Sequence, residues 1–394
     1  MPRRQQASVL VIVLVTIVFA TSALLLFIER AADDLIVPMR TNDSNKLRSE
    51  AYSALDTTLA VLVDFNTVNG GLRSPSEGWN DPLTWAGFTP SVDSRTVEVT
   101  FVDESGKISL PTATAANLTN LFSSWGMADQ DSQTLIDGLF TWMKRNYTPT
   151  SATAETSADY QQDPIPFTPP GRSLRSWSEL SSITSVNALF FDSNGVLTDL
   201  GKRFEASFSL YSFASSNVNG GLHDTIVALG SSGSGTALLD DTAVQKLLDY
   251  LGGTGATQLG VQGASFFKTI AQVSSTAGVR VRTTQLGTTI SALRVNVTVK
   301  EGQAFFLLSA VVAPTGGATV VAAPALTANA TTTTTGSTVT EAPTAPPALN
   351  YPFTILELTE TDQNPALTSN ATTSNSTTDS SPFPAPDAGS QPSS

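Results

Sequence analysis

The chain has 394 residues, enough for one or two domains, and a formal net charge of −13, which argues against nucleic acid as a partner. It contains no cysteine, and this excludes a disulfide framework and thiolate metal sites. Its single histidine, His223, leaves little room for histidine-dependent catalysis or a histidine-rich metal site.

The chain begins with a short basic leader, residues 1–7, followed by an apolar run from Ser8 to Ile28. As a helix, this run would span roughly 30 Å, the thickness of the hydrocarbon core of a bilayer. Arg3 and Arg4 precede the run and acidic residues follow it, so the positive-inside rule places the N-terminus in the cytoplasm. A cleaved secretory signal is the alternative, but its apolar core would be shorter, about 7–15 residues. We therefore predict a retained single-pass span.

Helical periodicity continues beyond the apolar run. Pro38 predicts a kink or a break. Apolar residues then recur on one helical face as far as the Gly70-Gly71 pair. These residues are Leu47, Ala51, Ala54, Leu55, Leu59, Leu62 and Phe65. The pattern predicts one long membrane and spine helix over residues 8–66, bent near Pro38, whose outer apolar stripe must be covered by a folded domain.

The next segment, residues 67–110, predicts the first part of an α+β domain. It opens with a proline-containing loop. Val97, Val99 and Phe101 then alternate with polar residues, which is typical of a strand. The turn residues at 104–106 predict that this strand folds back as a hairpin.

Residues 111–205 predict an inserted all-α domain. Apolar residues recur there at helical spacing, for example Leu135, Leu139 and Phe140. The pattern Ser-Trp-Ser-Glu at 176–179 predicts a capping box that opens a short helix.

Residues 206–313 predict the second part of the α+β domain. The clearest signal is the alternation from Leu293 to Val299, followed by Glu301-Gly302 as a turn and a returning strand that ends at Val312. One face of this hairpin is polar, so we expect an antiparallel sheet with one side open to water or to another subunit.

The C-terminal part changes composition. Residues 314–350 are rich in Ala, Thr and Pro and predict a disordered linker. Residues 351–361 predict one more edge strand with Pro352 at its start. Residues 362–394 are again rich in Ser, Thr and Pro and predict a disordered tail.

The sequence offers no catalytic constellation. His223 lies beside Asp224 after a Gly-Gly turn, which is typical of a surface turn. The glycines at 230–235 lack the Gly-Lys-Ser/Thr ending of a phosphate-binding loop. Five acids could in principle supply oxygen ligands for calcium, but they lack the spacing of a calcium loop. These acids are Asp137, Glu155, Asp159, Asp163 and Asp192.

A basic leader followed by a small residue and an apolar helix resembles the type IV pilin and pseudopilin class. The resemblance implies cleavage by a prepilin peptidase between Ala7 and Ser8. It also identifies the fifth mature position, usually Glu, as Ile12. That substitution is typical of one branch, the minor pseudopilin called general secretion pathway protein K of type II secretion.

Four further segments resemble motifs of that branch, in the same order along the chain. They are the segment at 103–110, the helix at 135–142, the segment at 177–180 and the turn at 217–219. The matching motif residues are Asp103, Gly106, Asp137, Trp142, Glu179, Leu180, Asn217 and Asn219. The resemblance implies a pilin-like α+β fold, with a long helix packed on an antiparallel sheet and interrupted by the all-α insertion.

The resemblance also implies a function. The chain would be a non-enzymatic minor pseudopilin in the bacterial inner membrane, with its main domain in the periplasm and its place at the pseudopilus tip. Its partners would be the other minor pseudopilins and the major one. Calcium is possible by resemblance, but no metal site and no cofactor is assigned. The alternatives are a membrane-anchored periplasmic binding or scaffold protein and a minor pilin of a type IV pilus.

Overall fold

The computed structural model describes residues 3–162, 165–231, 238–253, 266–281, 284–321, 350–351 and 353–362. In the first helix, side chains are described for residues 13–28, 30 and from 44 onward. Most of the predicted linker, residues 322–349, and nearly all of the predicted tail, residues 363–394, lie outside this part of the chain.

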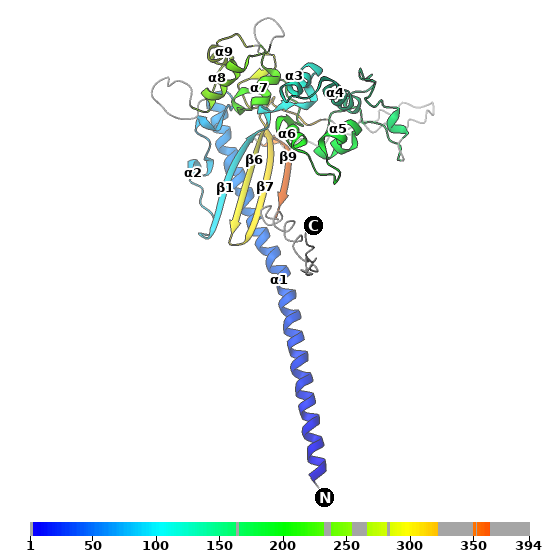
Figure 1. Cartoon of the computed structure of the whole chain (residues 1–394). Helices are drawn as coiled ribbons and strands as arrows, with labels where there is room; N and C mark the ends of the chain where they lie inside the picture. Colours follow the sequence, from blue (N-terminus) through cyan, green and yellow to red (C-terminus); the bar gives the residue numbers. More distant parts are fainter. Residues whose placement is uncertain are drawn as a thin grey trace, which may run out of the picture.

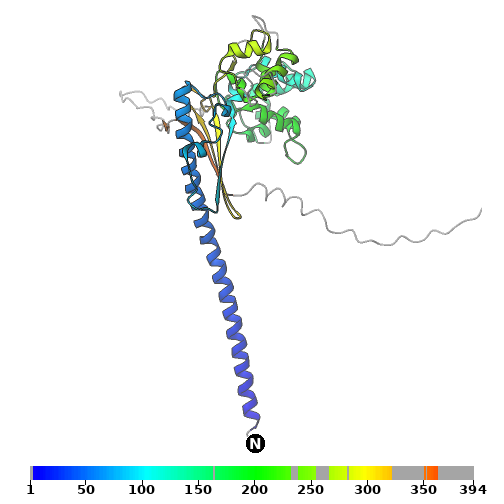
Figure 2. The same ribbon diagram turned by 90° about the vertical axis from the view of Figure 1, so that its left-hand side faces the viewer.

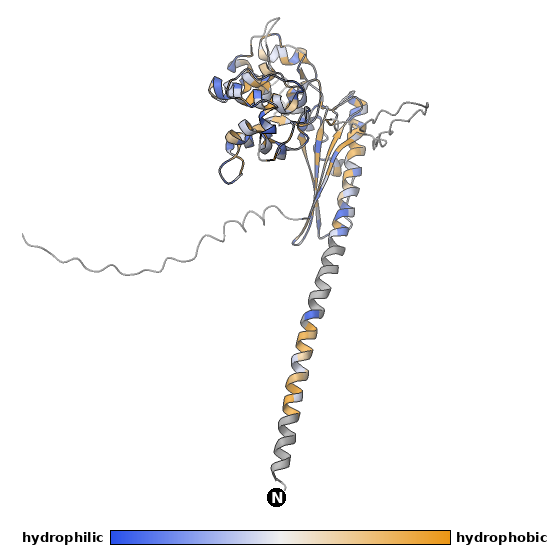
Figure 3. Ribbon diagram, turned by 90° about the vertical axis from the view of Figure 1, so that its right-hand side faces the viewer, coloured by the Kyte–Doolittle hydropathy of each residue, from blue (hydrophilic) through white to orange (hydrophobic). Residues whose placement is uncertain are grey.

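The fold is built on one long helix, α1, which runs over 67 residues from Arg3 to Asn69. It continues through Pro38, so the proline does not end a first segment, and it stops at Gly70, where φ is +64°. The N-terminal half of α1 stands clear of the folded body (Figure 1), and its apolar side chains are exposed, for example Phe19 and Phe27 at 76% and 71%. Colouring by hydropathy shows the same apolar stretch below the body (Figure 3). No helix in the described part of the chain combines the length and apolarity needed to cross a membrane.

A five-stranded antiparallel sheet packs against the outer half of α1, with the strand order β1-β6-β7-β9-β8 (Figure 1). The strands are β1 (Arg95–Asp103), β6 (Leu293–Glu301), β7 (Ala304–Ala313), β8 (Asn350–Tyr351) and β9 (Phe353–Thr361). Alternate residues of β6 point at α1, and Val295, Val297 and Val299 are completely buried there. Burial of each of these valine side chains stabilises the fold by about 1.5 kcal/mol or more. This face of the sheet therefore fixes the position of the sheet on the helix.

An ionic contact fastens α1 to the edge of the sheet. Arg95 at the start of β1 lies between two carboxylates, 3.2 Å from Glu50 on α1 and 2.7 Å from Glu301 at the end of β6. Glu50 also accepts a hydrogen bond from the backbone N–H of Ser91 at 2.9 Å. The Arg95 and Glu50 side chains are each only 6% exposed, so neither charge could be buried without the other.

The predicted hairpin at 293–312 is present as β6 and β7, with Glu301 opposite Ala304 and Gly302 at φ +60° in the turn. The predicted strand at 351–361 is present as β9, paired with β7. The hairpin expected after β1 is wrong. Instead, β1 pairs with β6 along its whole length, and β2 (Ile108–Ser109) leaves the sheet to pair in parallel with β3 (Phe208–Ser209).

Residues 108–286, which we call the helical unit, share a second hydrophobic core. Its α-helices are α3 (Ala115–Ser124), α4 (Asp129–Met143), α5 (Thr184–Phe190), α6 (Asp199–Ser207), α7 (His223–Leu229), α8 (Asp241–Leu251) and α9 (Ile270–Ala277). The short strands β4 (Ser216–Asn217) and β5 (Leu286–Gly287) pair in parallel within it. The predicted boundary at residue 205 is therefore too early, because α7, α8 and α9 fill the same core as the helices before them.

The helical unit lies at the end of the sheet farthest from the N-terminus of α1 (Figures 1 and 2). A short helix, α2 (Pro82–Ala86), packs beside α1 on the way to β1. The molecule is thus a long rod with a sheet on its outer half and a wide helical body beyond the sheet.

Candidate functional site

Four of the eight motif residues meet where the sheet, α1 and the helical unit join. Asn217, in β4, donates one hydrogen bond to Asp103 Oδ2 at 2.7 Å and another to the backbone carbonyl of Arg73 at 2.8 Å. Its own side-chain oxygen accepts from the backbone N–H of Asn219 at 3.1 Å. One amide side chain therefore connects the end of β1, the segment after α1 and the helical unit.

The Asp103 carboxylate is the electrostatic centre of this junction. Ser105 Oγ donates to it at 2.6 Å, in addition to the bond from Asn217. Burial raises the pKa of Asp103 to about 6, although the hydrogen bonds from Ser105 and Asn217 favour the charged form and oppose the rise. The group therefore titrates close to neutral pH rather than near its usual value of about 4.

Gly106 and Gly220 allow the two backbones at the junction to touch. A Cβ atom at Gly220 would lie 2.6 Å from the Gly106 Cα, and a Cβ at Gly106 would lie 2.9 Å from the Gly220 Cα. Both contacts are with backbone atoms, so no side-chain movement could relieve them. Glycine at 106, which the family motif contains, is therefore required by close approach.

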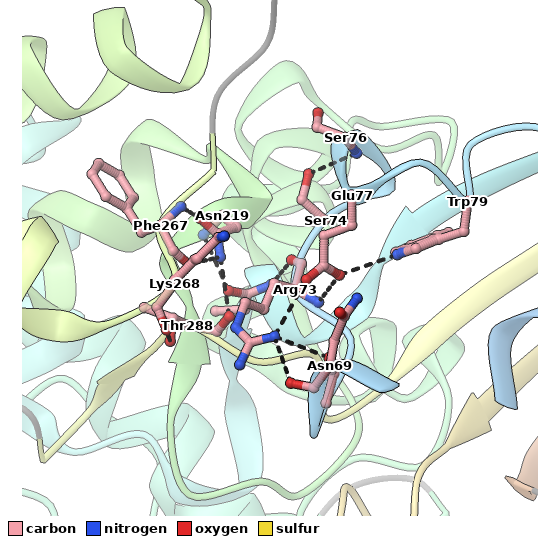
Figure 4. A network of polar contacts seen from close by, with 12 residues as sticks. Asn69, Arg73, Ser74, Ser76, Glu77, Trp79, Asn219, Phe267, Lys268 and Thr288 are labelled. Atoms are coloured by element: carbon pink, nitrogen blue, oxygen red, sulfur yellow. Dashed lines mark hydrogen bonds and ion pairs between the residues drawn. The ribbon is translucent and has the colours of Figure 1, made fainter. Parts of the chain in front are cut away.

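Asn219 ties two later segments into the same junction (Figure 4). Its side-chain amide donates to the backbone carbonyls of Phe267 and Thr288, each at 3.0 Å, and its oxygen accepts from the Phe267 N–H at 2.7 Å. Thr288 lies in the segment between β5 and β6. The junction thus fixes both the entrance to the helical unit, after β1, and its exit, before β6.

Arg73 and Glu77 complete the junction just after the C-terminal end of α1 (Figure 4). The Arg73 guanidinium donates to the carbonyls of Asn69 and Gly71, each at 3.2 Å, and so satisfies the end of α1. Glu77 accepts from the Arg73 N–H at 2.8 Å and from the Trp79 indole at 3.2 Å. The sequence motifs did not single out Arg73, because its contribution is mainly a backbone carbonyl.

The other motif residues lie deeper in the helical unit and do not reach the junction. The indole N–H of Trp142, in α4, donates to Glu179 Oε2 at 3.2 Å. Glu179 also accepts from the Arg172 guanidinium at 3.1 Å and from the Arg175 N–H at 3.0 Å. The expected capping box is therefore wrong in part: Ser176 caps the 3₁₀ turn Trp177–Ser182, but Glu179 turns back to Arg172 and Trp142. Leu180 beside it is fully buried.

Asp137, also in α4, holds the loop that follows this helix. It accepts from the Tyr147 hydroxyl and from the Ser151 N–H, both at 2.6 Å, and from the Thr150 N–H at 2.9 Å. Burial acts to raise the pKa of Asp137, but these donors outweigh it and hold the pKa below its ordinary value. Burial and the neighbouring carboxylate together raise the pKa of Tyr147 to about 12.

The carboxylates of the described residues do not gather into a metal centre. No group of three or more acidic or histidine side chains in this part of the chain could hold an ion. Asp137 already accepts hydrogen bonds on both oxygens, and Asp159 and Asp192 cap their own turns. Asp163 lies outside the described residues. Glu155 Oε2 is buried and accepts no hydrogen bond among the described residues, so calcium stays a prediction from the resemblance and no site is assigned.

The processing residues and the lone histidine can be placed only in part. Ala7, Ser8 and Ile12 fall within the bounds of α1, but their side chains lie outside the described residues. His223 begins α7, and its side chain is half exposed, 3.5 Å from Asp224. Asp224 in turn binds Arg203 at 2.8 Å, which gives it a structural ion-pair partner.

Comparison with known families identifies the stretch that contains most of these motif residues. The family model of type II secretion system protein K matches residues 100–193. This stretch of the chain is similar to protein K. The resemblance inferred from the motifs is thereby confirmed, and the matched stretch of this protein K-like chain includes Asp103, Gly106, Asp137, Trp142, Glu179 and Leu180.

One solved structure similar to this protein K-like chain is the crystal structure of the GspK–GspI–GspJ complex from the type 2 secretion system of enterotoxigenic Escherichia coli. The similarity covers 72% of this chain and 94% of that chain, at 12% identity and a TM-score of 0.40. No curated protein matches the chain in sequence.

Proposed function

We propose that this chain is a minor pseudopilin of a type II secretion system and that it occupies the tip of the periplasmic pseudopilus. The observation that carries the proposal is the protein K match at residues 100–193, within a body mounted on a helix that extends far beyond it. The chain would act as a structural subunit, through assembly rather than catalysis.

The N-terminal half of α1 would lie first in the membrane and later in the pseudopilus. Residues 8–28 would hold the subunit in the inner membrane, with the N-terminus in the cytoplasm as Arg3 and Arg4 favour. The same apolar surface would later pack against the helices of sibling pseudopilins. Either environment would remove from water the exposed apolar side chains of the described part, Val13 to Ile28.

The place of the helical unit supports a position at the tip. It lies at the end of the sheet opposite the N-terminus of α1, as Figure 1 shows, and adds a second core beside that of the rod. A subunit with so wide a body at that end would block the addition of another subunit ahead of it. This explains Ile12: without a subunit ahead, a glutamate there would find no amine to neutralise it and would be costly in lipid.

The partners would be other pseudopilins. In the similar complex from E. coli, GspK is bound to GspI and GspJ. We propose the corresponding minor pseudopilins, together with the major one, as partners of this chain.

The processing of the N-terminus gives the direct test. The chain is expressed together with a prepilin peptidase, and its intact mass is measured after purification. The mature protein should begin at Ser8, and Ala7→Glu should block cleavage, whereas Gln6→Glu should be cut like the wild type. A mature chain that begins beyond Ile28 would contradict the proposal, because the anchoring helix would then be lost.

Assembly gives the second test. The full chain should co-purify with its sibling pseudopilins from membranes, and Ile12→Glu should not increase the yield of that complex. If Ile12→Glu instead produced subunits joined tightly at both ends, the tip position would be wrong, although membership of the pseudopilus would stand.

A further inference from the structure

The outer edge of strand β1 is not paired with another strand of the described chain, and a groove separates it from α2 and the loop that follows α2. Strand β1 pairs with β6 over nine consecutive residues without any shift in register, and in the described part of the chain no strand pairs with its other side. Native proteins usually block such edges with proline, lysine or a bulge, and β1 contains none of these. The opposite edge is different, because a register shift at Val311/Val312 and the short β8 interrupt it.

A groove of about 390 Å³ runs along this free edge. It is lined by Val97, Glu98 and Val99, three consecutive residues of β1. Side chains of consecutive strand residues point to opposite faces, so only the outer edge of the strand can present all three. Across the groove from β1 lie Leu83 of α2 and Phe88, which follows α2. These two side chains give the groove an apolar floor on the side that faces α1.

The ionisable side chains that line the groove are both acidic. They are Asp81, which caps α2, and Glu98, which is exposed on the face of the sheet away from α1. Neither carboxylate belongs to an ion pair formed among the described residues. The groove therefore carries negative charge that no ion pair among the described residues compensates, beside a strand edge with which no described strand pairs.

We propose that the outer edge of β1 accepts an extended strand of a partner protein, with a basic side chain opposite Glu98 and apolar β-branched side chains on either side of it. Main-chain hydrogen bonds would supply the affinity, as in other cases of strand addition. The apolar side chains would fill the floor near Val97, Val99 and Leu83, and the basic one would pair with Glu98 across the strands. This inference does not depend on the proposed place in the pseudopilus.

The charge of the partner strand is tested with two defined peptides. The probes are fluorescein-labelled acetyl-Thr-Val-Lys-Val-Thr-Val-amide and its twin with Glu in place of Lys, and binding to the detergent-solubilised full chain is followed by anisotropy. The Lys peptide should bind about three- to tenfold more tightly than the Glu peptide. Glu98→Lys should reverse this preference, whereas Asp131→Lys, at an exposed site on α4, should leave it unchanged.

The mode of binding is tested on the backbone. N-methylation of alternate residues on one side of the Lys peptide should abolish binding, while methylation on the other side should not. Hydrogen exchange at residues 97–99 should slow when the peptide binds. Failure of the Lys peptide to bind, equal binding of both methylated forms, or protection in β9 instead of β1 would overturn the proposal. So would self-association of the chain that Glu98→Lys abolishes, because the occupant would then be a second copy.

Discussion

Single side chains at the junction form several hydrogen bonds each. Asn217 uses both amide hydrogens, and its side-chain oxygen accepts a third hydrogen bond. Asn217 donates one of these bonds to the Asp103 carboxylate, and burial raises the pKa of Asp103 to about 6. The junction should therefore respond to pH through Asp103.

The pH response of Asp103 has a defined sign. Its pKa is about 6 in the folded chain and near 4 in the unfolded chain, so the folded state binds the extra proton between these values. The free energy of unfolding should therefore fall as pH rises from 4 to 7, by about 2–3 kcal/mol relative to Asp103→Asn. Urea unfolding of both proteins at several pH values measures this difference. Asp131→Asn, at an exposed site, should keep the wild-type slope; parallel curves for the wild type and Asp103→Asn would refute the prediction.

At the scale of elements, α4 organises the helical unit through its two faces. Gly138 lies against Ser185 of α5 so closely that a Cβ would reach 2.0 Å from the Ser185 hydroxyl, and this lets the two helices pack. The residue before Gly138, Asp137, accepts hydrogen bonds from the N–H groups of the following loop. The loop thus depends on one carboxylate for its conformation.

Replacing that carboxylate should release the loop. Asp137→Asn would place an amide donor against the N–H groups of Thr150 and Ser151, and should lower the free energy of unfolding by about 2–3 kcal/mol at pH 7. Because the pKa of Asp137 is depressed, its contribution is present above the unfolded pKa and is lost as pH falls through the folded one. Hydrogen exchange at Thr150 and Ser151 should accelerate. Asp129→Asn, in the first turn of the same helix, should change neither; an unchanged exchange rate in Asp137→Asn would rule out this role.

At the scale of the whole molecule, two large hydrophobic cores are joined by the polar junction and by a small apolar cluster, in which Tyr211 and Phe213 pack with Val311 and Ala313 of β7. One core lies between α1 and the sheet, and the other fills the helical unit. The chain crosses between them after β1 and again before β6, and Asn217 and Asn219 bind both crossings. Cooperativity between the cores should depend on these side chains.

Removing Asn217 should separate the unfolding of the two cores. In Asn217→Ala, Asp103 and the Arg73 carbonyl lose a buried donor, so we expect the single calorimetric transition of the wild type to split into two. Calorimetry of the full chain in detergent measures this directly. Asn187→Ala, at an exposed site in α5, should keep one transition. A single transition shifted only in temperature would show that the cores are coupled by other contacts.

The sequence by itself determined the elements whose signals are local. The stripe from Leu47 to Leu62 predicted the spine helix, and the alternation in β6 predicted the hairpin with β7, because both periods can be counted within one segment. Motif residues such as Asp103 and Asn217 were also found, each in its own segment. The N-terminal cleavage site and the membrane span stay predictions from the sequence.

Only the tertiary structure decided which segments meet. The pairing of β1 with β6 joins residues 190 to 206 positions apart, and alternation in β1 fits any antiparallel partner equally well. The extent of the helical unit was misjudged for the same reason. The apolar face of an amphipathic helix such as α8 indicates that the helix packs on a core, but it does not indicate which core. The junction itself needed Arg73, whose backbone carbonyl carries no sequence signal, because every residue has one.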